Sequence, residues 1–153
     1  MPSLTILSPF TGRVVPIEQV PDVVVAEKLV GDGLAVDLAD GRVTAPADGE
    51  LAVFVGSGHA FAMRAEELEI IVHMGLDTVK LGGRGFEQLA QVGTQVRAGQ
   101  VVAQTDLEII RAAGYSLISP VVIANLPESA RLVKAPANTT VRAGVDPLFS
   151  VEL

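Results

Sequence analysis

The chain has 153 residues, contains no cysteine, and has only two histidines. Without cysteine there are no disulfide bonds and no metal sites built on thiolates, although this alone does not indicate a cellular compartment. Hydrophobic residues make up 49% of the chain, yet no uninterrupted apolar stretch approaches the roughly 20 residues that span a bilayer as a helix. We therefore expect no direct insertion into a membrane.

The chain also lacks a cluster of lysine and arginine. It carries 18 acidic and 11 basic residues, which gives a formal charge of −7. Proteins that bind nucleic acid neutralise phosphates with basic side chains, so we expect no nucleic-acid partner. The first residues show neither a basic segment nor a long apolar one, so no secretory signal is predicted. We expect a cytoplasmic protein.

Short strands dominate the expected secondary structure. A chain of this length forms one ordinary domain, and we treat residues 1–153 as a single domain. Apolar segments of four to six residues, bounded by proline, glycine or Asp-Gly, predict strands at residues 4–7, 12–17, 34–38 and 51–55. This spacing is typical of sandwiches and barrels. We predict an all-β fold, an antiparallel β-sandwich or barrel with one or two short helices.

Helix is expected in two places. Residues 85–91 are long enough for a turn or two, and residues 106–114 begin with an aspartate cap and end with glycine. Residues 20–33 are apolar without clean alternation, and we expect some of their valines to face outward. Residues 8–12 resemble 45–49, and 95–102 resemble 140–147. Either similar turns attract similar residues, or the barrel contains duplicated hairpin units.

The two histidines lie in apolar, β-prone segments on either side of a polar break at residues 64–69. If the chain turns back at this break, the hairpin brings the imidazoles of His59 and His73 face to face. A lone histidine in an apolar strand is usually a core residue whose nitrogens are hydrogen-bonded. Here Gly58, Ser57 and Asp77 lie within four residues of the histidines, which favours a functional site.

Several motifs in a fixed order carry a family resemblance. They are Val20-Pro-Asp-Val-Val, Ala26-Glu-Lys-Leu-Val-Gly-Asp-Gly33, Ala45-Pro-Ala-Asp-Gly49, His59-Ala-Phe61, Val72-His-Met-Gly-Leu-Asp-Thr-Val79, residues 83–86 and Ser119-Pro-Val-Val122. Over nearly its whole length the sequence resembles the glucose-type enzyme IIA domain of the bacterial phosphoenolpyruvate-dependent sugar phosphotransferase system. The resemblance implies a flattened antiparallel β-sandwich. It also implies a phosphocarrier that accepts phosphate from phospho-HPr and passes it to an enzyme IIB domain during sugar uptake.

The family pattern His-x-Gly-x-Asp-Thr implies that His73 carries the phosphoryl group and that His59 stabilises it. A neutral imidazole is a competent nucleophile at cytoplasmic pH. A hydrogen bond from Nδ1 of His73 to the carbonyl of Gly75 would leave Nε2 free to react. We expect Ser57 to orient His59 through its hydroxyl, and Asp77 to hold the loop after His73 or to contact a partner.

A set of apolar residues falls where this family places a docking rim around the histidines. Composition alone would assign such residues to the core. The predicted rim comprises Val24, Val25, Leu29, Val30, Val55, Val72 and Val79. Valine stands at Val25, Val55 and Val72, where we expect phenylalanine in close relatives, so partner preference is expected to differ.

Two other functions stay open. A regulatory protein would use phosphorylation of His73 to change which target binds the rim, and this is compatible with a phosphocarrier. A zinc-dependent hydrolase would use His59, His73 and Asp77 as ligands, but the chain has no HExxH motif and no third histidine. No cofactor is required, and zinc between His59 and His73 is the one metal considered. The resemblance does not name the sugar, which is glucose, N-acetylglucosamine or a β-glucoside.

Overall fold

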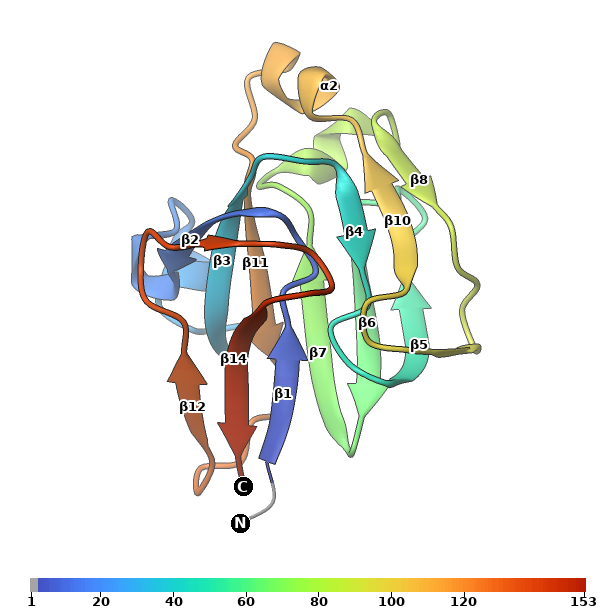
Figure 1. The fold of residues 1–153 in the computed structure, drawn as a ribbon. Helices are drawn as coiled ribbons and strands as arrows, with labels where there is room; N and C mark the ends of the chain where they lie inside the picture. The colour runs from blue at the N-terminus through green and yellow to red at the C-terminus, as the bar shows by residue number, and fades with distance from the viewer. Residues whose placement is uncertain (1–2) are drawn as a thin grey trace.

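The computed structural model describes residues 3–153 as three antiparallel sheets (Figure 1). The large sheet has the order β13 (Thr140–Val141), β2 (Gly12–Pro16), β3 (Asp32–Leu38), β11 (Ile118–Ile123), β7 (Leu68–His73), β6 (Ala60–Ala65), β5 (Gly49–Phe54) and β9 (Gln95–Val96). One small sheet has the order β1 (Ser3–Leu7), β14 (Pro147–Glu152), β12 (Arg131–Lys134), and the other β4 (Arg42–Thr44), β10 (Val101–Thr105), β8 (Phe86–Gln88). The helical segments are η1 (Ile17–Gln19), α1 (Val23–Ala26), η2 (Thr78–Leu81) and α2 (Leu107–Ala112). The predicted all-β fold with short helices is confirmed.

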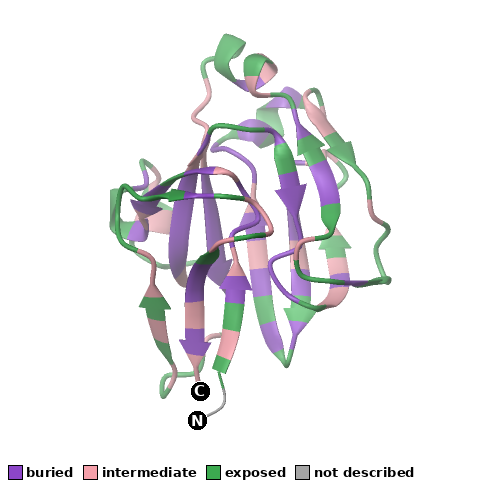
Figure 2. Cartoon of the chain, viewed as in Figure 1, coloured by how far each residue is buried: buried purple, intermediate pink, exposed green. Residues whose placement is uncertain are grey.

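The core lies between the large sheet and the two small ones. In Figure 1 β1, β14 and β4 lie on the near side with β3, β11 and β7 behind them, and Figure 2 shows long buried segments on β3 and β11. Strand β7 illustrates how the sheet divides its side chains. Leu68, Ile70 and Val72 are buried in the core, and Ile71 and His73 are only half buried. Because side chains alternate along a strand, this register places His73 on the outer face of the large sheet.

The similar segments found in the sequence make equivalent hydrogen bonds. The amide of Gly99 donates to the carbonyl of Ala45 at 2.9 Å, and the amide of Gly144 donates to the carbonyl of Ser8 at 2.9 Å. The two halves of the large sheet, on either side of the central β11–β7 pair, also have matching edges. Strand β13 pairs with β2 at one edge, and β9 pairs with β5 at the other. These observations favour duplicated hairpin units over a chance likeness of turns.

The helix predicted at residues 85–91 is wrong, because this segment contains strand β8. Gly82, Gly83 and Gly85 have φ values of +62°, +97° and +93°, which hold the backbone in the left-handed region and prevent a helix from starting there. Phe86 then pairs with Thr105 of β10. Edge pairing to β10 therefore decides the structure of this segment, and single-sequence helix signals do not report it.

The helix predicted at residues 106–114 is confirmed as α2. The carboxylate of Asp106 accepts hydrogen bonds from the amides of Glu108 at 3.0 Å and Ile109 at 3.4 Å. Gly114 ends the segment with a φ of +83°. Both ends match the expected helix signals.

Helix α1 was not predicted. Asp22 caps it by accepting from the amides of Val24 at 3.0 Å and Val25 at 3.4 Å. Its β-branched valines masked the helix, because they have low helix propensity. The cap holds these valines in one short turn beside the large sheet.

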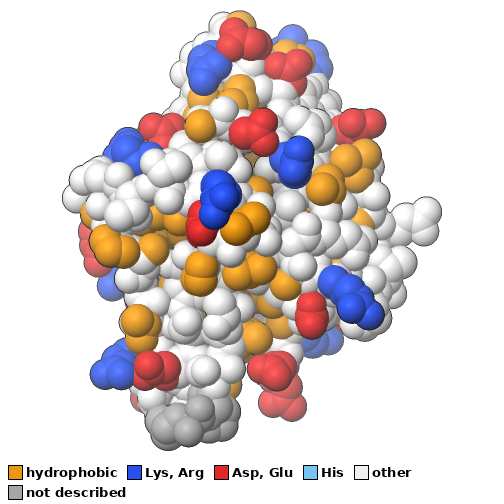
Figure 3. Space-filling model, viewed as in Figure 1, with side chains coloured by type: hydrophobic (Ala, Val, Ile, Leu, Met, Phe, Trp, Pro, Cys, Tyr) orange, Lys and Arg blue, Asp and Glu red, His pale blue; other side chains and the backbone are white. Residues whose placement is uncertain are grey.

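No helix in the described part of the chain is long and apolar enough to cross a membrane. On the face shown in Figure 3 lysine and arginine side chains are scattered among acidic ones. This distribution agrees with the absence of a basic cluster in the sequence.

Candidate functional site

A tight hairpin brings the two histidines together, as the sequence predicted. Strands β6 and β7 pair so that Ala60 lies opposite His73. The two-residue turn consists of Glu66 and Glu67, whose φ values of +48° and +70° match the turn that joins twisted antiparallel strands. The imidazole centroids of His59 and His73 are 5.0 Å apart with an interplanar angle of 70°.

The ring of His73 is fixed by a backbone carbonyl. Its Nδ1 atom lies 2.7 Å from the carbonyl oxygen of Gly75. A carbonyl oxygen accepts hydrogen bonds but cannot donate them, so Nδ1 carries the proton. In the neutral ring the lone pair is then on Nε2, and the chemistry available at this nitrogen is nucleophilic attack or metal binding.

The loop that supplies this carbonyl is itself held in place. The amide of Gly75 donates to Oγ of Ser119 at 2.8 Å, and Oγ1 of Thr78 donates to the carbonyl of Met74 at 2.6 Å. Gly75 has a φ of +74°, and a Cβ atom there would lie 2.9 Å from the carbonyl oxygen of Ser116. Glycine is therefore required at this position by both conformation and space.

His59 lies in the loop immediately before β6. Its Nδ1 atom lies 2.6 Å from Oγ of Ser57, so the expected contact between Ser57 and His59 is present. The side chain of Phe86 packs against the same imidazole with a centroid distance of 6.4 Å. His59 is 8% exposed, so little of the residue contacts solvent.

Burial keeps both imidazoles neutral. Desolvation lowers the pKa of His59 below its ordinary value, and the charge of a protonated His73 would lower it further. Desolvation also lowers the pKa of His73, although the hydrogen bond to Gly75 and the charges of Asp22 and Asp77 raise it. Both rings are therefore mainly unprotonated at neutral pH, which leaves a nucleophilic nitrogen available.

An apolar hollow of about 380 Å³ opens beside His73 on the outer face of the large sheet. Its lining residues are Asp22, Val24, Val25, Val30, Ile71, His73, Leu76, Asp77, Val79, Pro120 and Val122. Asp22 was not predicted as a site residue. Its signal was available, since an aspartate before an apolar run is a helix-cap pattern. Asp22 and Asp77 place two carboxylates in a mainly apolar lining.

Most of the predicted rim residues reach the surface. Val24, Leu29, Val30 and Val79 are exposed, and Val25 and Val55 are half buried. The assignment of Val72 to the rim is wrong, because Val72 is fully buried in the core. Strand alternation turns the neighbouring Ile71 outward instead, and Ile71 lines the hollow.

Asp77 begins η2 in a left-handed conformation with a φ of +60°. Within residues 3–153 its carboxylate forms no hydrogen bond to the start of η2, so the expectation that it holds the loop through backbone amides is not supported. The carboxylate lines the hollow beside His73. A contact with a partner stays a prediction for this residue.

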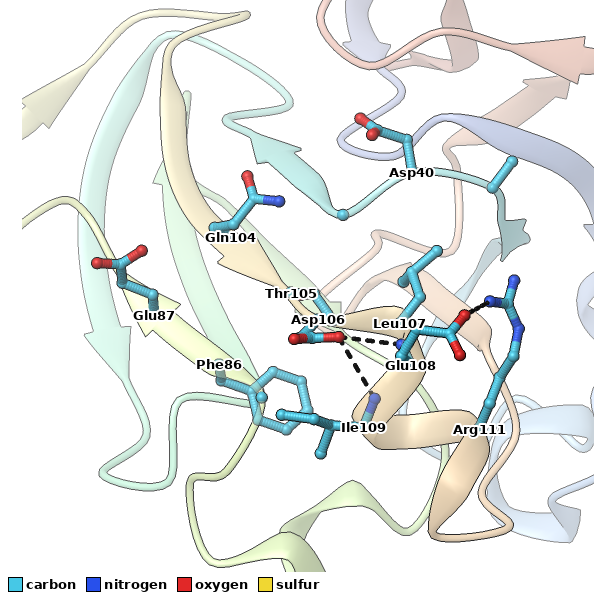
Figure 4. Close-up of a pocket in the computed structure, with 13 residues that line it drawn as sticks. Asp40, Phe86, Glu87, Gln104, Thr105, Asp106, Leu107, Glu108, Ile109 and Arg111 are labelled. Carbon is cyan, nitrogen blue, oxygen red and sulfur yellow. Dashed lines mark hydrogen bonds and ion pairs between the residues drawn. The ribbon is translucent and has the colours of Figure 1, made fainter.

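A larger groove of about 630 Å³ lies between β8 and α2 (Figure 4). Several of its polar side chains are engaged within the protein, although within residues 3–153 the buried hydroxyl of Thr105 has no hydrogen-bond partner. Asp106 caps α2, Glu108 pairs with Arg111 at 2.6 Å, and Asp40 accepts from the amide of Arg42 at 3.3 Å. His73 lines the smaller hollow, so its nucleophilic nitrogen does not belong to this groove.

Residues 3–153 contain no group of three or more histidine, cysteine or acidic side chains placed to hold a metal ion. The two histidines alone supply two nitrogen ligands, one fewer than a catalytic zinc site normally uses. Zinc at His59 and His73 stays a prediction, and the zinc-hydrolase alternative gains no support from the geometry.

A family model and several proteins of known name are similar to this chain. Residues 4–129 match the family model described as phosphoenolpyruvate-dependent sugar phosphotransferase system, EIIA 1. The chain is 42% identical over 125 residues to the glucose-specific EIIA component of Haemophilus influenzae, covering 81% of this chain and 75% of that protein. It is 44% identical over 149 residues to the N-acetylglucosamine-specific EIICBA component of Klebsiella pneumoniae, covering 97% of this chain. This chain spans 23% of the length of that relative.

Among solved structures, the glucose permease IIA from Mycoplasma capricolum has a similar fold. The TM-score is 0.90 at 29% sequence identity, and the match covers 98% of this chain and 96% of that one. The similarity therefore extends over the whole β-sandwich and includes the hairpin that carries both histidines.

Proposed function

The chain belongs to the EIIA 1 family of the phosphoenolpyruvate-dependent sugar phosphotransferase system and is a phosphotransferase component of that system. We propose that His73 is its phosphoacceptor. The observation that carries this assignment is the bond between Nδ1 of His73 and the carbonyl of Gly75. It directs the lone pair to Nε2 without requiring a separate base. We propose that residues 1–153 act as one such domain.

In the proposed transfer, one bond to phosphorus forms while another breaks in a single step. The lone pair on Nε2 of His73 forms a bond to phosphorus while the bond from phosphorus to the donor group breaks. The donor keeps that electron pair. The depressed pKa of His73 favours this step, since a protonated Nε2 has no lone pair to offer.

His59 is proposed to stabilise the phosphoryl oxygens. Its ring is 5.0 Å from that of His73, centroid to centroid, and Ser57 holds its Nδ1 atom. Its Nε2 atom is then free of that contact and serves as a donor to the phosphoryl group. A positioned donor matters most when charge develops on the transferring oxygens.

HPr and an enzyme IIB domain are the proposed donor and acceptor of the phosphoryl group. The fused EIICBA composition named for the Klebsiella pneumoniae relative supports the link to IIB. The hollow beside His73 and its exposed valines provide an apolar surface for docking. We propose that the exchange takes place in the cytoplasm, on a sugar of the glucose, N-acetylglucosamine or β-glucoside type.

A regulatory role would use the same residues. A phosphoryl group on His73 places about two negative charges beside the apolar hollow, which would change its affinity for protein targets. This second function adds to the carrier role and does not replace it.

The proposal is tested by incubating the protein with phosphoenolpyruvate, enzyme I and HPr. Wild type should acquire one acid-labile phosphate, and the variant His73→Ala should acquire none. Circular dichroism and thermal unfolding of the variant show whether it remains folded. Stoichiometric labelling of a folded His73→Ala protein would refute the assignment.

A further inference from the structure

Phe86 lies on strand β8 and contacts the imidazole of His59 from the side. The two ring centroids are 6.4 Å apart with an interplanar angle of 62°. This edge-to-face arrangement lies within the favourable range for aromatic pairs. On the basis of the proposed function, we propose that Phe86 is a positioning residue. Together with Ser57, it fixes the His59 imidazole in the orientation needed to face a phosphoryl group on His73.

One hydrogen bond does not fix an imidazole ring. Ser57 holds the Nδ1 atom of His59 at 2.6 Å, but the ring has two side-chain torsions and can pivot about that contact. A bulky aromatic side chain beside the ring restricts this motion by filling the space into which it would swing. A hydrogen bond at Nδ1 and an aromatic contact to the ring thus act together on the direction in which Nε2 of His59 points.

Phe86 is itself held on a supported strand. It pairs with Thr105 of β10, and the carbonyl of the preceding Gly85 accepts from the amide of Asp106 at 2.8 Å. A Cβ atom at Gly85 would lie 3.2 Å from the Cγ2 atom of Ile109 on α2. Figure 4 shows the ring of Phe86 beside Ile109. Helix α2 therefore backs the strand segment that carries Phe86.

The loop that carries His59 packs directly on the same strand. A Cβ atom at Gly58 would lie 3.0 Å from the Cβ atom of Phe86. Glycine at this position lets the loop approach β8 closely enough for the two rings to meet. The contact between Phe86 and His59 is thus built into both segments.

Phe86 lines the groove beside α2 and is not among the residues lining the hollow beside His73. A substitution of Phe86 should therefore leave partner docking unchanged and alter the orientation of the His59 ring. Kinetics can distinguish a positioning role from a docking role. Loss of a positioning residue changes the rate of the transfer step, and loss of a docking residue changes KM.

The test compares Phe86→Leu with a matched control, Phe54→Leu. Phe54 is also partly buried and packs on the same core, but its ring stacks on Phe61 at 5.5 Å. We expect Phe86→Leu to accept phosphate with an unchanged KM for phospho-HPr and to discharge to enzyme IIB more slowly, by roughly two- to tenfold. The pKa of His59, followed by NMR, should rise because the ring is less desolvated.

A conservative variant completes the design. Phe86→Tyr keeps the ring and should behave as wild type, and Phe86→Met provides a second variant without the ring. Unchanged discharge and His59 titration in the Phe86→Leu and Phe86→Met variants would overturn the proposal, as would equal changes in Phe54→Leu. Unfolding of both ring-deleted variants would assign Phe86 to fold stability and also overturn it. A wild-type protein that takes no phosphate would instead contradict the proposed function.

Discussion

Nδ1 of His73 donates to the carbonyl oxygen of Gly75 at 2.7 Å, so a residue two positions along the chain determines which nitrogen of His73 is free. The carbonyl is oriented by the left-handed backbone of Gly75, whose φ is +74°, and by the bond from its amide to Ser119. The tautomer of the neutral histidine is therefore set by a backbone carbonyl and not by an acidic side chain.

The substitution Gly75→Ala should destabilise the protein and slow its phosphorylation. The added Cβ atom would lie 2.7 Å from Cγ2 of Thr78 and 2.9 Å from the carbonyl of Ser116. Backbone strain and overpacking together should lower the free energy of unfolding by about 2 to 5 kcal/mol, measured by denaturant titration.

Gly93→Ala is the control for this substitution. Gly93 has a similar φ of +88°, and a Cβ atom there meets nothing within 4 Å. It should lose about 1 to 2 kcal/mol from backbone strain alone and accept phosphate at the wild-type rate. Equal losses in both variants would contradict the importance of the space around Gly75.

The substitution Val24→Glu should weaken docking of phospho-HPr without unfolding the protein. Val24 is 47% exposed and lines the hollow beside His73. A carboxylate buried without a partner in the complex should raise KM by roughly tenfold or more, measured from initial phosphorylation rates. Val133→Glu, 49% exposed before substitution and located on β12, serves as the control. Comparable increases in KM for both variants would argue against a specific docking surface at Val24.

The lowered pKa values of the two histidines predict a pH dependence of stability. Burial favours the neutral rings in the folded state, so the unfolded chain binds protons more readily than the folded one below its ordinary histidine pKa of about 6.5. The free energy of unfolding should therefore decrease as the pH falls from about 6.5 towards the lowered folded-state pKa values, and level off below them, where both states bind the protons. Denaturant titrations of wild type and a His59→Gln/His73→Gln variant should show a weaker pH dependence in the variant. An equal dependence would mean that other groups dominate in this range.

Much of the site was predictable because it depends on short-range patterns. The hairpin follows from two apolar strands around a polar break, and α2 follows from an aspartate cap and a closing glycine. The family resemblance supplied the proposed roles of the histidines. What patterns did not supply was the direction of individual side chains, as the one-residue error between Val72 and Ile71 shows.

The remaining errors have a common physical cause. Strand β8 exists because its backbone pairs with β10, and the contact from Phe86 to His59 depends on that pairing. Helix α1 is a single turn held by Asp22 in spite of its valines. Tertiary contacts decide the conformation of both segments against weak local propensity.

The variant His59→Gln should separate acceptance from donation of the phosphoryl group. Nε2 of His73 does not depend on His59 for its lone pair, so the variant should still be labelled at His73. A phosphoryl group on His73 adds negative charge that favours a protonated His59. Glutamine retains a donor but cannot become a cation, so discharge to enzyme IIB should slow by about 10²-fold. Single-turnover kinetics can measure the two steps separately. Wild-type rates for both steps would remove the proposed role of His59.

We propose that the phosphoryl group is carried on Nε2 of His73, because Nδ1 donates its proton to the carbonyl oxygen of Gly75. The most direct measurement is an NMR experiment on the phosphorylated, ¹⁵N-histidine-labelled protein that detects the bond between nitrogen and phosphorus. We expect one phosphorus coupled to Nε2 of His73, with Nδ1 still protonated. Coupling to Nδ1 of His73, or to either nitrogen of His59, would contradict the account.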